Sequence, residues 1–216
     1  MKSILVIGMG EFGIHLAKKM QELGNDVMVV DRNPEIIEQV APQFTDSLIG
    51  DCTNEAVLQS LGINNFDICF VTTGSDFQAS LVITSLLKKL NAQYIVSKAK
   101  QEIQKELLYK IGANEVIYPE PDLAERLSIR YNANNIFDFI PVTDNYAIYE
   151  IPVPAAWVNL TIKEINVRQK FHVNIIAVKQ GNSLNPAPGG DYCFQKDDHI
   201  VVIGESLYIF RIAGKS

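Results

Sequence analysis

Apolar runs alternate with amphipathic stretches through the first 132 residues of the chain. Runs such as ILVIG and ICFVT are apolar on both faces, as strands of a parallel sheet covered by helices on both sides require. The pattern predicts strands over 3–8, 26–31, 45–49, 67–72, 93–97 and 115–118, and helices over 11–23, 34–41, 53–61, 76–90, 101–111 and 121–132. This alternation indicates an α/β fold with a Rossmann-like, doubly wound parallel sheet.

The breaks between helices and strands resemble one another in this part of the chain. The stretches QELGNDVMVV, QSLGINNFDICFV and YKIGANEVIYP each hold a helix end, a glycine, a few polar residues and a new strand. Glycine commonly follows a helix in the left-handed conformation, and asparagine is its usual substitute. We therefore expect this conformation at Gly24, Gly62, Asn91 and Gly112.

The pattern changes after about residue 135. The stretch YAIYEIPVP (146–154) predicts a strand, and a short helix over 161–170, a strand over 173–179, a loop over 181–190, a strand over 199–204 and a final helical stretch follow. These elements indicate a small α+β domain. We expect a Rossmann-like nucleotide-binding domain over 1–133, a linker over 134–143 and the α+β domain over 144–216.

Three glycines, Gly8, Gly10 and Gly13, form a G-x-G-x-x-G motif between the first strand and the first helix. In this context the first glycine permits a tight turn, the second lets a pyrophosphate approach the backbone, and the third allows close packing of helix on strand. Asp31 ends the second strand, where a carboxylate accepts both ribose hydroxyls and repels a 2′-phosphate. The alternative is a fold of the same kind that has lost its ligand.

Residues at the ends of the other strands extend the candidate site, because parallel strands present these ends at one edge of the sheet. Asp51 and Cys52 are placed to meet the adenine, although Asp51 or Thr53 can equally cap the next helix. Ser75 is expected to cap the helix after the fourth strand in a capping box with Gln78. Lys98 is placed to reach a phosphate. The complete candidate site is Gly8, Gly10, Glu11, Phe12, Gly13, Asp31, Arg32, Asp51, Cys52, Thr72, Thr73, Gly74 and Lys98.

Composition narrows the functional classes. The net charge is −6 and the pI is about 5.1, which argues against a nucleic-acid partner. The longest apolar run falls well short of the roughly 18 residues of a membrane span. Three widely spaced cysteines form neither a zinc motif nor a disulfide framework, so we expect a reducing, cytoplasmic compartment. Because no nucleophile is spaced to pair with His15, His172 or His199, we expect no enzymatic activity.

The chain resembles the RCK (regulator of potassium conductance) family, and within it the cytosolic gating subunits of Ktr/Trk potassium uptake systems. The resemblance covers nearly the whole chain, including a second half that dehydrogenases lack. It rests on VIGMGEFG (6–13), VVDRNPE (29–35), GDCTNEAVLQSLGI (50–63), TGSDFQASL (73–81), KIGANEVIYPEPDLAERL (110–127), INVRQKFHVNIIAVKQG (165–181) and LNPAPGGDYCFQKDDHIVVIG (184–204).

The resemblance implies homodimers that assemble into a ring, commonly an octamer, on the cytoplasmic face of a membrane-embedded potassium-translocating subunit. It implies that ATP, ADP, NAD or NADH binds at the glycine turn and gates the transporter. It also implies that Glu120 helps to hold Mg²⁺ or Ca²⁺ near the phosphates at the dimer contact, although acids are common at any helix start. A cyclic di-AMP site is implied in the second domain, at positions that are partly core positions as well: Ile162, Ile165, Asn166, Arg168, Ile175, Ile176 and Pro188.

Glu11 departs from the family pattern, in which an arginine at this position meets the terminal phosphate of ATP. Two like charges about 4 Å apart repel by about 1 kcal/mol in water. A cation can bridge Glu11 and the phosphates, the ligand can lack a terminal phosphate there, or Glu11 can point to solvent. We favour a nucleotide other than ATP. The competing functional class is a small NAD-dependent oxidoreductase.

Overall fold

The computed structural model describes residues 1–74, 76–132, 136–143 and 145–214. Its internal contacts divide the chain into two compact units, Met1–Glu120 and Pro121–Ser216. Each unit has its own sheet, and the two sheets share no strand. The units are therefore described one after the other.

The sheet of the first unit has six parallel strands in the order β3-β2-β1-β4-β5-β6. The chain fills one half of the sheet from β1 outward to β3, and then returns to the centre with β4. A doubly wound sheet binds its ligand where the order reverses in this way. This confirms the predicted fold class, and the strands are β1 Ser3–Ile7, β2 Asp26–Asp31, β3 Asp46–Ile49, β4 Ile68–Val71, β5 Ile95–Lys98 and β6 Glu115–Ile117.

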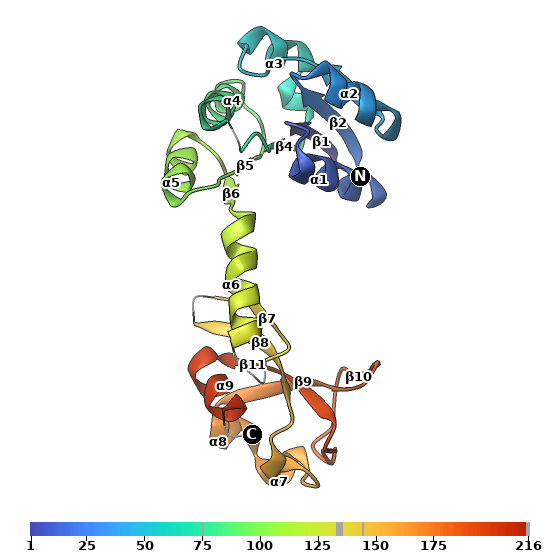
Figure 1. Ribbon diagram of the computed structural model, residues 1–216, viewed down its shortest axis with the longest axis vertical. Coiled ribbons are helices and arrows are strands. Elements are labelled where there is room, and N and C mark those ends of the chain that lie inside the picture. The colour runs from blue at the N-terminus through green and yellow to red at the C-terminus, as the bar shows by residue number, and fades with distance from the viewer. Residues whose placement is uncertain (75, 133–135, 144, 215–216) are drawn as a thin grey trace. The chain divides into compact units, whose positions relative to one another are not determined.

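Helices cover both faces of this sheet (Figure 1). On one face, α1 and α2 pack on alternate strand residues such as Val6 and Val29. On the other face, α3 and α4 pack on the intervening residues, such as Leu5 and Val71. The helices are α1 Glu11–Glu22, α2 Pro34–Val40, α3 Glu55–Leu61, α4 Phe77–Lys89 and α5 Glu102–Ile111, with short 3₁₀ turns η1 Ala41–Gln43 and η2 Ile63–Asn65.

The ends of these helices match the repeated pattern in the sequence. The left-handed conformation is confirmed at all four expected positions, with φ of 82°, 66°, 58° and 119° at Gly24, Gly62, Asn91 and Gly112. Each residue lets the chain turn back toward the sheet, and the three glycines do so without the steric cost that a Cβ brings.

Two predictions about helix starts are wrong. The α3 helix begins at Glu55 and is capped by Asn54, whose side chain accepts from the Ala56 N–H, so neither Asp51 nor Thr53 caps it. Asp76 caps α4 by accepting from the Ala79 N–H, in place of the expected Ser75. Ser75 itself lies outside the described residues. Asp and Asn are both strong N-cap residues, and the sequence offers several adjacent candidates at each start.

The second unit contains a five-stranded antiparallel sheet in the order β10-β9-β11-β8-β7. Its inner face buries Tyr149, Ile200 and Val202 against Ile209 of the last helix. This confirms the small second domain. Its elements are α6 Pro119–Asn132, β7 Asp138–Pro141, β8 Tyr146–Pro152, η3 Ala155–Trp157, α7 Ile162–Ile165, α8 Val167–Phe171, β9 Val173–Gln180, β10 Ser183–Asn185, β11 Asp198–Glu205 and α9 Ser206–Ala213, of which α6 begins within the first unit.

The structure differs from the sequence-based expectation at three places in this unit. The helix expected over 161–170 is divided into α7 and α8 because Asn166 adopts a left-handed conformation with φ of 54°. Strand β7 lies in the range expected to be a linker, and β10 lies in the expected loop. Both strands are short edge strands of three or four residues that pair with the neighbouring strand in the sequence, and neither is long enough to show a clear apolar alternation.

Candidate nucleotide-binding site

A pocket of about 310 Å³ lies at the carboxyl edge of the first sheet. The ends of β1, β2, β3 and β4 line it, so the pocket occupies the place where the strand order reverses. Eight residues of the candidate site line this pocket: Gly8, Gly10, Asp31, Arg32, Asp51, Cys52, Thr72 and Thr73.

The three glycines of the turn meet different surroundings. A Cβ on Gly13 would lie 2.1 Å from the Gly8 carbonyl oxygen and 2.7 Å from Thr72 Oγ1, so α1 packs too closely for any side chain there. Gly8 has φ of 97°, a conformation that L side chains rarely adopt. Gly10 has no heavy atom within 4 Å of its Cβ position. Gly10 is therefore the glycine that leaves open space for a ligand.

The Asp31 carboxylate joins the glycine turn to the end of β2. Its Oδ2 accepts from the Met9 N–H at 2.6 Å, and its Oδ1 accepts from the Asn33 N–H at 2.8 Å. Each carboxylate oxygen has two lone pairs, so both oxygens retain capacity to accept from ribose hydroxyls. The two backbone N–H groups hold the carboxylate in place.

Asp51 and Cys52 form the wall of the pocket that follows β3. Asp51 Oδ1 accepts from the Thr53 hydroxyl at 2.7 Å and from the Thr53 N–H at 2.9 Å, and these bonds hold the pKa of Asp51 below its usual value. Burial and the nearby charges of Asp51 and Asp31 raise the pKa of Cys52 to about 12. The Cys52 thiol is therefore neutral and supplies a small apolar surface.

The two threonines after β4 have different roles. The Thr72 hydroxyl donates to the Ile7 carbonyl at 3.0 Å and also contacts the Gly8 carbonyl, so it holds the turn on the sheet. Thr73 Oγ1 is buried beside the pocket without a hydrogen-bond partner among the described residues. A buried hydroxyl without a partner is costly, and a polar ligand group in the pocket would satisfy it.

Some residues that line the pocket were not predicted from the sequence, and one of them, Asp76, is charged. Its Oδ2 lies 3.4 Å from Arg32 Nη1, so this exposed pair joins the end of β2 to the start of α4 at the pocket rim. The sequence does offer a signal for Asp76, because an Asp directly before a helix is a common N-cap, and the cap of α4 follows the end of β4. Asn33 and Ile36 also line the pocket, and both follow Asp31 closely in the sequence.

Five predicted residues lie outside this pocket, namely Glu11, Phe12, Gly13, Gly74 and Lys98. Glu11 is exposed in the first turn of α1, as one of the three readings of this residue expects. The Lys98 ammonium lies 2.7 Å from Glu120 Oε1 and 5.0 Å from the centroid of the Phe12 ring. Lys98 is thus paired with the residue that the family resemblance assigned to a metal ion.

The described residues contain no group of three His, Cys, Asp or Glu side chains arranged to hold a metal ion. Within the described ranges, no helix combines the length and the apolar character that a bilayer crossing needs. His199 Nδ1 lies 2.9 Å from Glu150 Oε1, which also accepts from the Lys179 ammonium at 3.0 Å. The polar partner of His199 is thus a carboxylate that an ammonium also binds, not a nucleophile.

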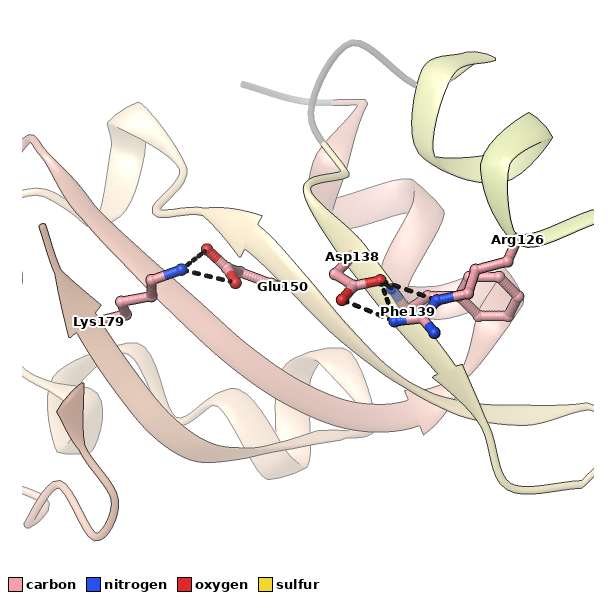
Figure 2. A network of polar contacts seen from close by, with 5 residues as sticks. All are labelled: Arg126, Asp138, Phe139, Glu150 and Lys179. Carbon is pink, nitrogen blue, oxygen red and sulfur yellow. Dashed lines mark hydrogen bonds and ion pairs between the residues drawn. The ribbon is translucent and has the colours of Figure 1, made fainter. Parts of the chain in front are cut away.

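Residues of the second unit that the resemblance assigned to a ligand lie on α7, on α8, between these two helices, on β9 and in the loop after β10. Arg168 Nε donates to Asn174 Oδ1 at 2.7 Å, which joins α8 to β9. Ile175 packs against the core of the unit, as its position in a strand also requires, and Ile176 and Pro188 are half-buried. Elsewhere in this unit, Figure 2 shows the Arg126 guanidinium bound to Asp138, and Lys179 bound to Glu150.

The first unit has the fold and the glycine turn of a Rossmann-type nucleotide-binding domain, and a small α+β domain follows it. The TrkA-N domain model matches residues 4–119, and the TrkA-C domain model matches residues 146–207. The chain therefore belongs to the TrkA-type family of Ktr and Trk potassium uptake proteins, which confirms the resemblance noted in the sequence.

Individual relatives agree with this assignment. The chain is 32% identical to Ktr system potassium uptake protein C of Bacillus subtilis (strain 168) over 210 residues, which covers 97% of this chain and 95% of the relative. It has the same identity and coverage with Ktr system potassium uptake protein A of that organism. A structure described as the GsuK channel bound to NAD shares the fold, with a TM-score of 0.69 at 22% identity. The match covers all of this chain but only 40% of the GsuK chain.

Proposed function

We propose that the chain is a cytosolic regulatory subunit of a potassium uptake system, and that a nucleotide is its signal. The observation that carries this proposal is the continuous match of both domains to the Ktr potassium uptake proteins. The membrane partner is a separate, potassium-translocating protein, on whose cytoplasmic face this subunit docks.

The ligand is an adenine nucleotide or NAD(H). The ribose lies against Asp31, the adenine against Asp51 and Cys52, and the pyrophosphate against the backbone at Gly10. Three features of the pocket support this placement: the held carboxylate of Asp31, the open space at Gly10 and the unsatisfied hydroxyl of Thr73. The GsuK structure with the same fold is described as bound to NAD, which fits this ligand class.

The nucleotide acts by shifting a conformational equilibrium and is not consumed. A ligand changes an equilibrium only when it binds one conformation more tightly than the other. Homodimers of the chain assemble into a ring, commonly of eight copies, and the bound nucleotide favours one shape of that ring.

The resemblance implied two further ligands, of which only cyclic di-AMP belongs to the proposal. Cyclic di-AMP is expected beside Arg168, whose guanidinium suits a phosphate, with Ile175, Ile176 and Pro188 as an apolar surface for adenines. A divalent cation at Glu120 fits the structure poorly, because that carboxylate already binds the Lys98 ammonium. We derive no step through a metal ion.

Calorimetric titration of the purified chain tests the proposed function. The ligands are AMP, ADP, ATP, NAD, NADH and cyclic di-AMP, each with and without Mg²⁺. Binding at micromolar concentration without chemical change of the ligand supports a sensor, whereas oxidation or reduction of NAD(H) would support the oxidoreductase class. Light scattering after size-exclusion chromatography tests the ring, and a dimer that never assembles further would contradict it.

A further inference from the structure

Lys98 was expected to reach a phosphate of the ligand, but in the structure its ammonium is already paired with the carboxylate of Glu120. Its ammonium contacts Glu120 at 2.7 Å and lies over the ring of Phe12, in the first turn of α1. The aliphatic part of Lys98 lies beside Gly74, at the end of β4. The side chain of Lys98 is 10% exposed, whereas that of Glu120 is 58% exposed. The buried partner of this ion pair is therefore the lysine.

Glu120 belongs to the first turn of α6, and its charge is balanced by Lys98. The hydrogen bond from Lys98 holds the pKa of Glu120 below its usual value. A divalent cation at Glu120 would stand next to the ammonium and be repelled by it. Within one copy of the chain, no other described acid, histidine or cysteine joins Glu120 in a group of three that would offset this repulsion. The contacts of Glu120 suit an ion pair better than a metal site.

We propose that, when a nucleotide binds, the Lys98 ammonium breaks its ion pair with Glu120 and binds a phosphate group of the ligand instead. This inference rests on the proposed binding of a nucleotide at the glycine turn. A terminal phosphate, or a pyrophosphate as a whole, carries more negative charge than one carboxylate and offers more acceptor oxygens to an ammonium. The flexible stem and three rotatable donors of lysine permit the exchange. Because Glu120 is largely exposed, water solvates the released carboxylate at low cost.

The exchange couples phosphate binding at the site to a change at the start of helix α6. Helix α6 begins at Pro119 in the first unit and continues into the second unit. A nucleotide displaces Glu120, in the first turn of this helix, from Lys98, whereas adenosine, which has no phosphate, leaves the ion pair intact. Glu120 and the ligand phosphate then compete for one cation, so each weakens the binding of the other to Lys98.

Substitution Glu120→Gln in the full-length chain tests the exchange by calorimetry with ADP and with adenosine. Without its competitor, Lys98 is available to the phosphates, so we expect about three- to tenfold tighter ADP binding and unchanged adenosine binding. The matched control is Glu125→Gln, which removes the same charge from an exposed position of α6. The control should leave both affinities unchanged, since a general effect of net charge would alter both variants alike.

A second pair of variants links the effect to Lys98. Substitution Lys98→Met should weaken ADP binding several-fold and leave adenosine binding unchanged, and adding Glu120→Gln to it should have no further effect. Weaker ADP binding by the Glu120→Gln variant only in the presence of Mg²⁺ would identify a metal ligand and overturn the exchange. Unchanged ADP binding would also overturn the exchange but leave the proposed function standing. Failure of the unmodified chain to bind any nucleotide would overturn both.

Discussion

Substitution Gly13→Ala should destabilise the first unit because the new methyl group has no room. The Cβ would lie 2.1 Å from the Gly8 carbonyl oxygen, and real Cβ contacts are essentially never shorter than 3.0 Å. The atom it meets is backbone, so α1 and the turn must separate by roughly 1 Å, which closely packed interiors resist. Overpacking of this kind costs about 1–3 kcal/mol. The shift would also strain the hydrogen bond between Thr72 and Ile7 that holds the turn on the sheet.

Gly10→Ala is the matched control, because it adds the same methyl group three residues earlier in the chain. Gly10 has φ of −71°, which any residue adopts, and nothing lies within 4 Å of its Cβ position. Its cost to stability is that of a poorer helix N-cap, below about 1 kcal/mol. The methyl group instead occupies the space in which a pyrophosphate would approach the backbone. We expect the variant to fold and to bind nucleotide at least about tenfold more weakly.

Thermal unfolding and calorimetric titration of both variants separate the two effects. A loss of 1 kcal/mol lowers Tm by about 2–4 °C in a chain of this size, so Gly13→Ala should lower it by several degrees. Gly10→Ala should change Tm by less than Gly13→Ala does. If Gly13→Ala is as stable as the unmodified chain, the close packing of α1 on the turn is refuted. If Gly10→Ala binds nucleotide normally, the phosphate does not lie at this turn.

Three further predictions concern single side chains. Asp31→Ala should weaken nucleotide binding by about 1–3 kcal/mol, because ribose hydroxyls would lose their acceptors, and unchanged affinity in a calorimetric titration would refute that contact. Burial raises the pKa of Glu150, but hydrogen bonds from His199 and a neighbouring lysine hold this pKa below its ordinary value of 4.5. The ionised carboxylate therefore stabilises the fold above pH 4.5, and this stabilisation is lost as the pH falls further. Tm measured between about pH 3 and 7 should therefore fall less steeply on the acid side for Glu150→Gln than for the unmodified chain. A thiol reagent should modify exposed Cys193 rapidly and buried Cys52 slowly, because the pKa of Cys52 is about 12, and mass spectrometry of the protein with Cys193→Ser would detect any exception.

The parallel sheet of the first unit could be predicted because each of its elements carries a local signal. The same features recur along the sequence: strands that are apolar on both faces, helices with apolar spacing, and a glycine or asparagine after four of the helices. The second unit gave weaker signals. Asn166 divides one predicted helix into two, and its left-handed conformation satisfies the geometry of the turn rather than any apolar spacing. The edge strands β7 and β10 exist only through their pairing with β8 and β9.

The candidate site could be predicted where one strand end determines the position of one residue. The parallel order places the residues after β1, β2, β3 and β4 at one edge, so Asp31, Asp51 and the glycine turn meet there. Contacts that depend on side-chain conformation could not be predicted. The sequence places Lys98 at the same edge, but it does not show that the ammonium contacts Glu120. The choice of Asp76 as a cap likewise depends on the local backbone.

The two ends of the candidate site are prepared for a ligand to different degrees. At the proposed adenosine end, backbone N–H groups hold Asp31, and Thr53 holds Asp51, so we expect binding there to require little rearrangement. At the phosphate end, Lys98 is paired with Glu120, and Glu11 adds a negative charge beside the turn. AMP, ADP, ATP and NAD(H) share adenosine and differ in what they present to the phosphate end. The adenosine end should therefore supply most of the affinity, while the ion pair of Lys98 and the charge of Glu11 decide which of these nucleotides is the signal.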